Sequence, residues 1–270
     1  MSALIASDGP WRNAGVHLSL CAIFLAGIAE ASGDRFAIWT GLALFLAGLP
    51  HGAGDEQDGQ IRRISLAHAL GYVIVGSAVT GLFLILPIAG LSLFIGLSGW
   101  HFARSECGLS PINRYAIAGL AIGGSALFKP EATRSVFAEV IAAQMPSIYV
   151  SILAISGLLG AGFALWAVAR RERGFGRSLL ALGAVALMHP VLAVGLIFLT
   201  AHAIPVQQRQ ASSYGQDSVL SAVAIPTVLA VAGAAIMIWG VTADAITVPV
   251  AIALSMGMAT PHMLTERLEA

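Results

Sequence analysis

Four histidines stand at the ends of four apolar stretches of the chain: His51, His101, His202 and His262. A neutral imidazole is the commonest protein ligand for iron, copper or zinc. An ionisable side chain inside membrane-like sequence is costly and is by default read as functional. If the helices bring these imidazoles to one depth, the sequence predicts a metal site in apolar surroundings. Such a site would suit a lipid-soluble substrate.

Two carboxylates, Asp55 and Glu106, follow His51 and His101. On a continuous helix Asp55 would lie one turn beyond His51 on the same face. A carboxylate in that place could orient an imidazole by accepting a hydrogen bond from its second ring nitrogen. We therefore take Asp55 and Glu106 as candidate catalytic residues, although two glycines between His51 and Asp55 favour a break in the helix.

A proline divides the long apolar run 178–206, directly after His189. On one straight helix His189 and His202 would differ by about 220° of rotation and would not face the same point. Since proline breaks a helix interior, the chain is expected to turn or distort at Pro190. His202 is therefore the better candidate ligand, and His189 is expected to cap or stabilise the break.

Composition places the chain in a membrane. It has 57% hydrophobic and only 10% charged residues, with a mean hydropathy of +0.85, whereas soluble domains carry about 25% charged residues. The formal net charge is zero, so no global field attracts nucleic acid. The two cysteines provide neither a disulfide framework nor a CxxC metal pair.

The apolar runs are continuous rather than alternating, which favours helices over a barrel. We expect an all-α, multi-pass transmembrane helix bundle of roughly eight to ten helical segments, formed by residues 1–270 as a single integral-membrane domain. A spanning helix needs roughly 20 apolar residues, and the candidate segments are about 14–31, 36–51, 65–86, 88–103, 112–128, 147–169, 178–206, 218–241 and 245–263.

Arginines indicate the orientation. The loop 170–177 carries four of them and is the strongest cytoplasmic marker, with Arg62 and Arg104 as weaker ones. These marks agree if the N-terminus is cytoplasmic, in a cell (inner) membrane, and if residues 129–146 form an external re-entrant or surface segment. All four histidines then fall on the cytoplasmic side, provided that the chain reverses near Pro190.

Five motifs in order resemble the Brp/Blh family of carotenoid-cleaving dioxygenases, over about residues 36–264. The motifs are Leu49-Pro50-His51-Gly52-Ala53-Gly54-Asp55, Ser98-Gly99-Trp100-His101-Phe102 with Glu106, Phe128-Lys129-Pro130-Glu131, His189-Pro190-Val191-Leu192-Ala193 running to His202, and Pro261-His262-Met263. The resemblance implies a multi-pass membrane protein that splits β-carotene at its central double bond with O₂ and yields two retinals. It also implies Fe(2+) held by four histidines, and it allows a rhodopsin that receives the retinal as a partner.

The resemblance carries over three of the four iron ligands, namely His51, His101 and His202. The family pattern places the fourth histidine four residues after His202, where this chain has Val206. Either His262 or His189 completes the site, or three histidines and water hold the metal, or the reaction has been lost.

Three functions follow from these observations. The leading hypothesis is a non-haem Fe(II) dioxygenase acting on β-carotene or a related carotenoid, with iron on His51, His101 and His202 and with His262 as a fourth candidate. The second is a non-catalytic relative that binds a carotenoid, a retinal or a rhodopsin, suggested by Val206. The third is a small transporter, which the scarcity of acidic residues in the apolar runs disfavours.

Overall fold

The computed structural model describes residues 10–53, 55–57, 60–62, 65–105 and 108–265. These residues are almost entirely helical, so the expected all-α class is confirmed. The elements in chain order are α1 (Pro10–Ala31), α2 (Asp34–Gly48), the 3-10 turn η1 (Leu49–Gly52), β1 (Asp55–Gln57), β2 (Gln60–Arg62), α3 (Leu66–Ile85), α4 (Pro87–Ser105), α5 (Pro111–Phe128), α6 (Pro130–Ile141), α7 (Ser147–Ala169), α8 (Phe175–Leu187), α9 (Pro190–Ile197), the π-helical segment η2 (Phe198–Ala203), α10 (Ile204–Tyr214), α11 (Gln216–Thr242) and α12 (Val248–Thr265).

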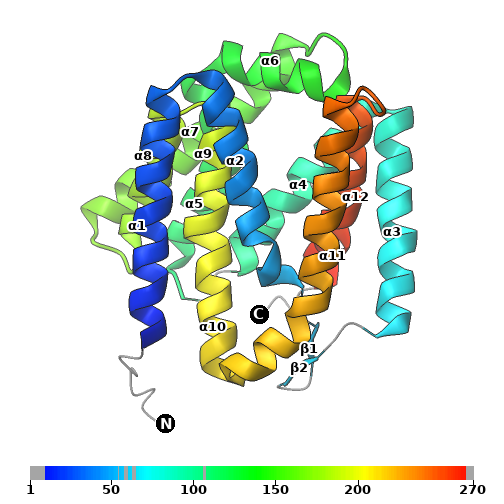
Figure 1. The fold of residues 1–270 in the computed structure, drawn as a ribbon. Coiled ribbons are helices and arrows are strands. Elements are labelled where there is room, and N and C mark those ends of the chain that lie inside the picture. The colour runs from blue at the N-terminus through cyan, green and yellow to red at the C-terminus, as the bar shows by residue number, and fades with distance from the viewer. Residues whose placement is uncertain (1–9, 54, 58–59, 63–64, 106–107, 266–270) are drawn as a thin grey trace.

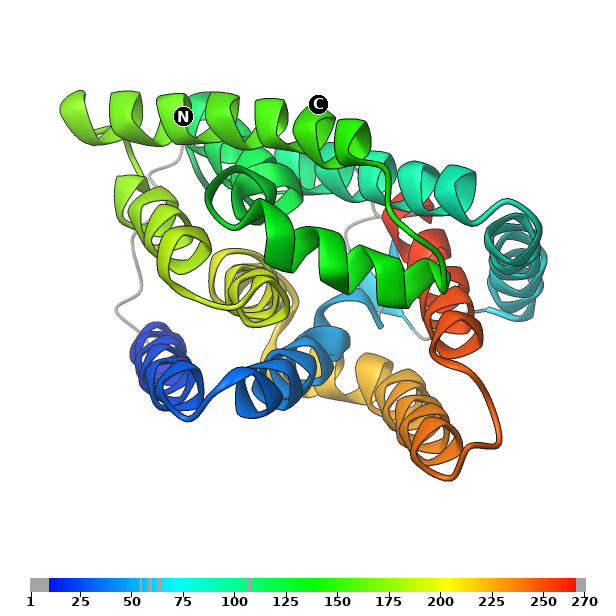
Figure 2. The same ribbon diagram turned by 90° about the horizontal axis from the view of Figure 1, so that it is seen from above.

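The helices run back and forth between two ends of the molecule (Figure 1). We call these the α6 end, after the helix that lies across it, and the hairpin end, after the antiparallel pair β1–β2. Helices α2, α4, α9–α10 and α12 all start near the α6 end and lead toward the hairpin end. Seen from above, α1 and α3 are viewed nearly end-on, whereas α7 lies lengthwise along one edge of the molecule (Figure 2). Within the segment 129–146, helix α6 lies across one end of the molecule (Figure 1), and the prediction that this segment is external stays a prediction.

Hydrogen bonds tie loops together at each end. At one end Ser110 N and Asn113 Nδ2 donate to the carbonyl of Arg173, at 3.3 and 3.0 Å. The loop before α5 therefore lies beside the arginine-rich loop before α8. At the other end, Lys129 Nζ donates to Leu187 O at 2.7 Å. These contacts are consistent with the prediction, from the arginine pattern, that the two loops lie on one side of the membrane, and the side itself stays a prediction.

The chain reverses where the sequence predicts it. Helix α8 ends at Leu187, Met188 is extended, and α9 begins at Pro190. His189 caps α9, since its Nδ1 accepts from Val191 N at 3.3 Å. The expected role of His189 as a cap of the break is confirmed. From Pro190 the chain runs on through η2 to Tyr214 as one helical rod.

Glycines allow the helices to pack closely, as small residues do in membrane bundles. A Cβ on Gly41 of α2 would come within 2.7 Å of Val191 O on α9. A Cβ on Gly76 of α3 would come within 2.6 Å of Gly257 O on α12. The rods that lead to the histidines are thus held at backbone contact with their neighbours, which fixes their depth.

Among the described residues, four helices are long and apolar enough to cross a membrane: Ala14–Ala31, Ser147–Ala169, Pro190–Tyr214 and Gln216–Thr242. Large apolar side chains on the outer faces of α7 and α11 are exposed, among them Ile152, Leu158 and Ile236. These features fit a membrane protein. The described residues hold helices α1–α12, more than the eight to ten expected, because α6 is a separate surface helix and the run 178–206 is split. That residues 1–270 form one domain stays a prediction.

Candidate metal centre

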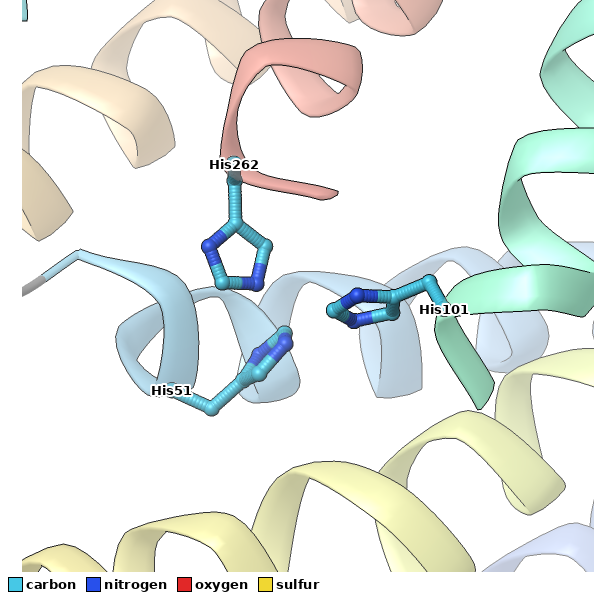
Figure 3. A group of neighbouring side chains, drawn as sticks. All are labelled: His51, His101 and His262. Atoms are coloured by element: carbon cyan, nitrogen blue, oxygen red, sulfur yellow. The ribbon is translucent and has the colours of Figure 1, made fainter. Parts of the chain in front are cut away.

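The four histidines at the ends of the apolar runs converge on one place in the bundle. His51 lies in η1, His101 in α4, His202 in η2 and His262 in α12. His202 Nε2 lies 3.1 Å from His51 Nε2 and 3.1 Å from His101 Nε2. Ring nitrogens of His51, His101 and His262 all lie within 4.8 Å of one another. Figure 3 shows the rings of His51, His101 and His262 pointing toward a common centre.

The rings of His202 and His262 each lie beside the rings of His51 and His101. The ring centroid of His202 is 4.7 Å from that of His51 and 4.9 Å from that of His101. The ring centroid of His262 is 4.9 Å from that of His51 and 5.2 Å from that of His101. His202 and His262 therefore each contact both of the other two rings.

His51 is oriented by its own turn. Pro50 starts the 3-10 turn that ends α2, because proline has no N–H and suits the first turn of a helix. The Nδ1 of His51 lies 2.6 Å from Gly48 O. Since a carbonyl only accepts, Nδ1 carries the hydrogen and donates it. In the neutral ring Nε2 then holds a lone pair, and this is the nitrogen that faces His202.

His202 lies in a widened turn of its rod. Pro205 lacks the N–H that would bond to Ala201 O, and a proline ring in a helix crowds the carbonyl four residues earlier. The helix responds with the π segment Phe198–Ala203, a feature that is rare and often found at functional sites. Thr200 Oγ1 donates to Leu196 O at 2.6 Å in the same region. His202 itself is fully buried.

His101 and His262 are placed by the contact of α4 with α12. Ser98 Oγ lies 3.8 Å from Met263 Sδ, which joins the two helices beside their histidines. His262 follows Pro261, which lies inside α12. The ring of His262 occupies the space above Gly52, where a Cβ would come within 2.6 Å of three ring atoms. Glycine at position 52 is therefore what allows α12 to bring His262 against η1.

Two phenylalanines close one side of the cluster. The ring of Phe102 packs edge-on against His202, with centroids 4.9 Å apart. Phe198 packs edge-on against His51 at 5.2 Å and contacts Phe102 at 6.4 Å. These rings and the buried residues around them keep the imidazoles in an apolar environment, and His51, His101 and His202 are at most 5% exposed.

The donor set fits a transition metal. Imidazole nitrogen binds iron, copper, zinc or nickel, at about 2.1 Å for zinc. Two ligands at that distance stand about 3.0–3.4 Å apart, depending on the coordination angle. The separations of 3.1 Å between His202 and its two neighbours agree with this range. Ring nitrogens of His51, His101 and His262 lie within 4.8 Å of one another, and His202 adds a fourth nitrogen 3.1 Å from those of His51 and His101.

The other candidate site residues, His189, Asp55 and Glu106, are not shown to belong to the cluster. His189 is at the α6 end, at the start of α9, and takes no part in the cluster. The helix breaks between His51 and Asp55, as the intervening glycines indicated, because the turn ends at Gly52 and Asp55 opens strand β1. The side chain of Asp55 and the whole of Glu106 lie outside the described residues.

Val206 lies in α10, four residues after His202, and is only 2% exposed. An apolar side chain is thus buried where the family pattern has its fourth histidine. The cluster contains four imidazoles nonetheless, because His262 enters it from α12 rather than from the rod that carries His202. Of the alternatives for a fourth histidine, the geometry favours His262 over His189.

Sequence reasoning missed one polar residue beside the cluster. Gln210 Nε2 donates to the backbone carbonyl of His51 at 3.1 Å. The two residues are 159 positions apart, and a glutamine in a polar stretch of α10 has no spacing that singles it out. The sequence likewise does not indicate that Gly52 makes room for the ring of His262, since His262 belongs to the last helix.

Comparison with known proteins agrees with the geometry. The model of one protein family, described as β-carotene 15,15'-dioxygenase, matches residues 42–268. The match includes all four clustered histidines. No curated protein and no solved structure matched the chain. Since the family model covers most of the sequence, this chain belongs to the β-carotene 15,15'-dioxygenase family.

Proposed function

We propose that this protein is a membrane-embedded non-haem iron dioxygenase that cleaves β-carotene, or a related carotenoid, with O₂. In the proposed reaction the central carbon–carbon double bond breaks and each carbon receives one oxygen atom of O₂. The products are two retinals, and a rhodopsin that takes up retinal is a proposed partner. The family supports the carotenoid substrate; iron, O₂ and the exact bond are part of the proposal.

One observation carries the proposal: imidazoles from four separate helical segments meet in an apolar bundle. We propose His51, His101, His202 and His262 as the ligands of Fe(2+). Ferrous iron in such a site would supply the activation of O₂ toward the polyene. An all-histidine set suits this metal, and so large a group of buried ring nitrogens has no evident structural purpose.

The protein's own residues contribute orientation and exclusion of water. The hydrogen bond from His51 Nδ1 to Gly48 O holds that ring with Nε2 toward the centre. Phe102 and Phe198 cover the cluster on one side, which keeps water from oxidised intermediates and gives an apolar surface for a polyene. We keep Asp55 and Glu106 as candidates for residues that act beside the ligands, on sequence grounds alone.

The proposed location is a cell (inner) membrane, crossed several times, with the N-terminus in the cytoplasm. The apolar helices support a membrane location, and the arginines of the loop 170–177 support the orientation. The metal centre would then lie toward the cytoplasmic side of the bilayer.

Retinal formation tests this function. The chain is expressed in bacterial cells that make β-carotene, and retinal is measured by chromatography together with the iron content of the purified protein. We expect retinal and about one iron per chain, and neither in His51→Ala. Iron-loaded, folded protein that yields no retinal would refute the proposed reaction.

A second candidate function is a carotenoid- or retinal-binding protein without catalysis. It is suggested by Val206, which is buried where the family has a ligand. This function predicts purified protein that holds pigment but no iron. The same metal analysis therefore separates the two, because the dioxygenase requires iron and the binding protein does not.

A further inference from the structure

Gln210 is a buried amide in contact with the metal centre. It lies in α10 and is only 2% exposed. Its Nε2 donates to the backbone carbonyl of His51, at 3.1 Å. A buried amide side chain is costly unless it is hydrogen-bonded, so this contact fixes where the glutamine lies. It joins the helix after His202 to the turn that carries His51.

The carbonyl of His51 stands at the end of a helix. The last carbonyls of a helix have no partner within it, and α2 with its 3-10 turn ends at Gly52. Gln210 supplies a donor at this point. The turn is thus held from two sides, by its own bond from His51 Nδ1 to Gly48 O and by the amide of Gln210.

The contact lies on the same two segments as a close pair of the proposed ligands. Gln210 is eight residues beyond His202 on one helical rod, about 12 Å along the axis. With the rod and the turn joined at Gln210, His51 Nε2 stands 3.1 Å from His202 Nε2. If the amide no longer held the carbonyl of His51, the turn could move relative to the rod, and this separation would change.

We propose that Gln210 is a positioning residue of the metal centre, which holds His51 at the separation from His202 that one metal ion requires. The inference rests on the proposed function, since it assumes that these histidines bind a metal. Gln210 touches neither the metal nor the substrate and acts through the backbone of His51. Loss of such a supporting contact typically weakens metal affinity by about 10–100-fold.

Metal binding by the purified full-length protein tests the proposal. Detergent-solubilised, metal-free protein is titrated with Co(II), whose visible absorption reports the ligand geometry. Gln210→Leu removes the donor at similar size, and we expect its Kd for Co(II) to rise about 10–100-fold, with shifted absorption bands. Gln210→Met also removes the donor at similar size and is expected to bind as weakly.

Gln208→Leu is the matched control. It makes the same change on the same helix, but Gln208 packs against Gly15 of α1. We expect it to keep the Kd and the spectrum of the unaltered protein. If Gln210→Leu fails to fold, Gln210→Met provides the same comparison, and Gln210→Asn, whose amide is one methylene group shorter, is also expected to bind Co(II) more weakly.

The outcomes separate the two proposals. If the unaltered protein binds Co(II) and all folded Gln210 variants have its affinity and spectrum, the positioning role is wrong and the proposed function stands. If Gln208→Leu weakens binding as much as Gln210→Leu, the effect is general to α10 and the positioning role is again wrong. If the unaltered protein binds neither Co(II) nor Fe(II), the proposed function fails, and the inference fails with it.

Discussion

Replacement of Gly52 by alanine should damage the metal centre through His262 alone. A Cβ at position 52 would lie 2.6 Å from Cδ2, Cε1 and Nε2 of His262, whereas carbon atoms in contact stand about 3.5–4.0 Å apart. The ring of His262 must therefore move away by about 1 Å. Metal–ligand distances tolerate only about 0.2 Å, so His262 can no longer serve as a ligand.

The fold should tolerate this change. The backbone of Gly52 is within a 3-10 turn rather than at positive φ, and the crowded atoms belong to the far end of one side chain. We expect a Co(II) Kd at least about 10-fold weaker in Gly52→Ala, with little change in the unfolding temperature. Gly71→Ala is the control, because nothing lies within 4 Å of the added methyl group.

A double-mutant cycle tests the reasoning further. If Gly52→Ala acts by displacing His262, the change should cause no further loss of Co(II) affinity in a protein whose His262 is already alanine. Co(II) affinities of the two single variants and the double variant give the coupling. Additive losses would refute the proposed route through His262, as would a Gly52→Ala protein that binds Co(II) as tightly as the unaltered protein.

Three further predictions concern the ligands and the α6 end. In a metal titration, His202→Ala should weaken Fe(II) binding by more than about 100-fold. His189 is remote from the cluster, so His189→Ala should keep the Fe(II) affinity of the unaltered protein. Equal effects of the two changes would contradict the assignment of His202 as a ligand. Lys129→Met should lower the free energy of unfolding by about 1–2 kcal/mol, since Lys129 Nζ donates to Leu187 O and pairs with Glu30 at 3.6 Å. Denaturant unfolding measures that loss, and Co(II) affinity should not change. Removal of iron by a chelator should lower the thermal unfolding temperature of the unaltered protein, because a ligand that binds only the folded state stabilises it; the chelator should have no effect on His202→Ala.

Much of the site could be predicted because its parts are local in sequence. A histidine at the end of an apolar run is visible in the chain, and the arginine pattern puts such ends on one side. The reversal at Pro190 follows from the chemistry of proline and is present between α8 and α9. Together these rules predicted that His51, His101, His202 and His262 could meet.

Contacts between distant segments could not be predicted. The contact of Gln210 with His51 and that of His262 with Gly52 join residues far apart in the chain, and both depend on the final packing of α10 and α12. The two glycines after His51 indicated a break in the helix, but not that the chain would turn into strand β1 at Asp55. The π segment at His202 is a response to Pro205 that no periodicity reveals.

X-ray absorption at the iron edge of the purified protein tests the central claim most directly. The account predicts one iron per chain with a shell of imidazole nitrogens at about 2.1 Å, fitted best by four histidines. The fitted number of imidazoles should fall by one in His262→Ala. An iron shell made mainly of oxygen, or a histidine number unchanged in His262→Ala, would contradict the four-histidine centre.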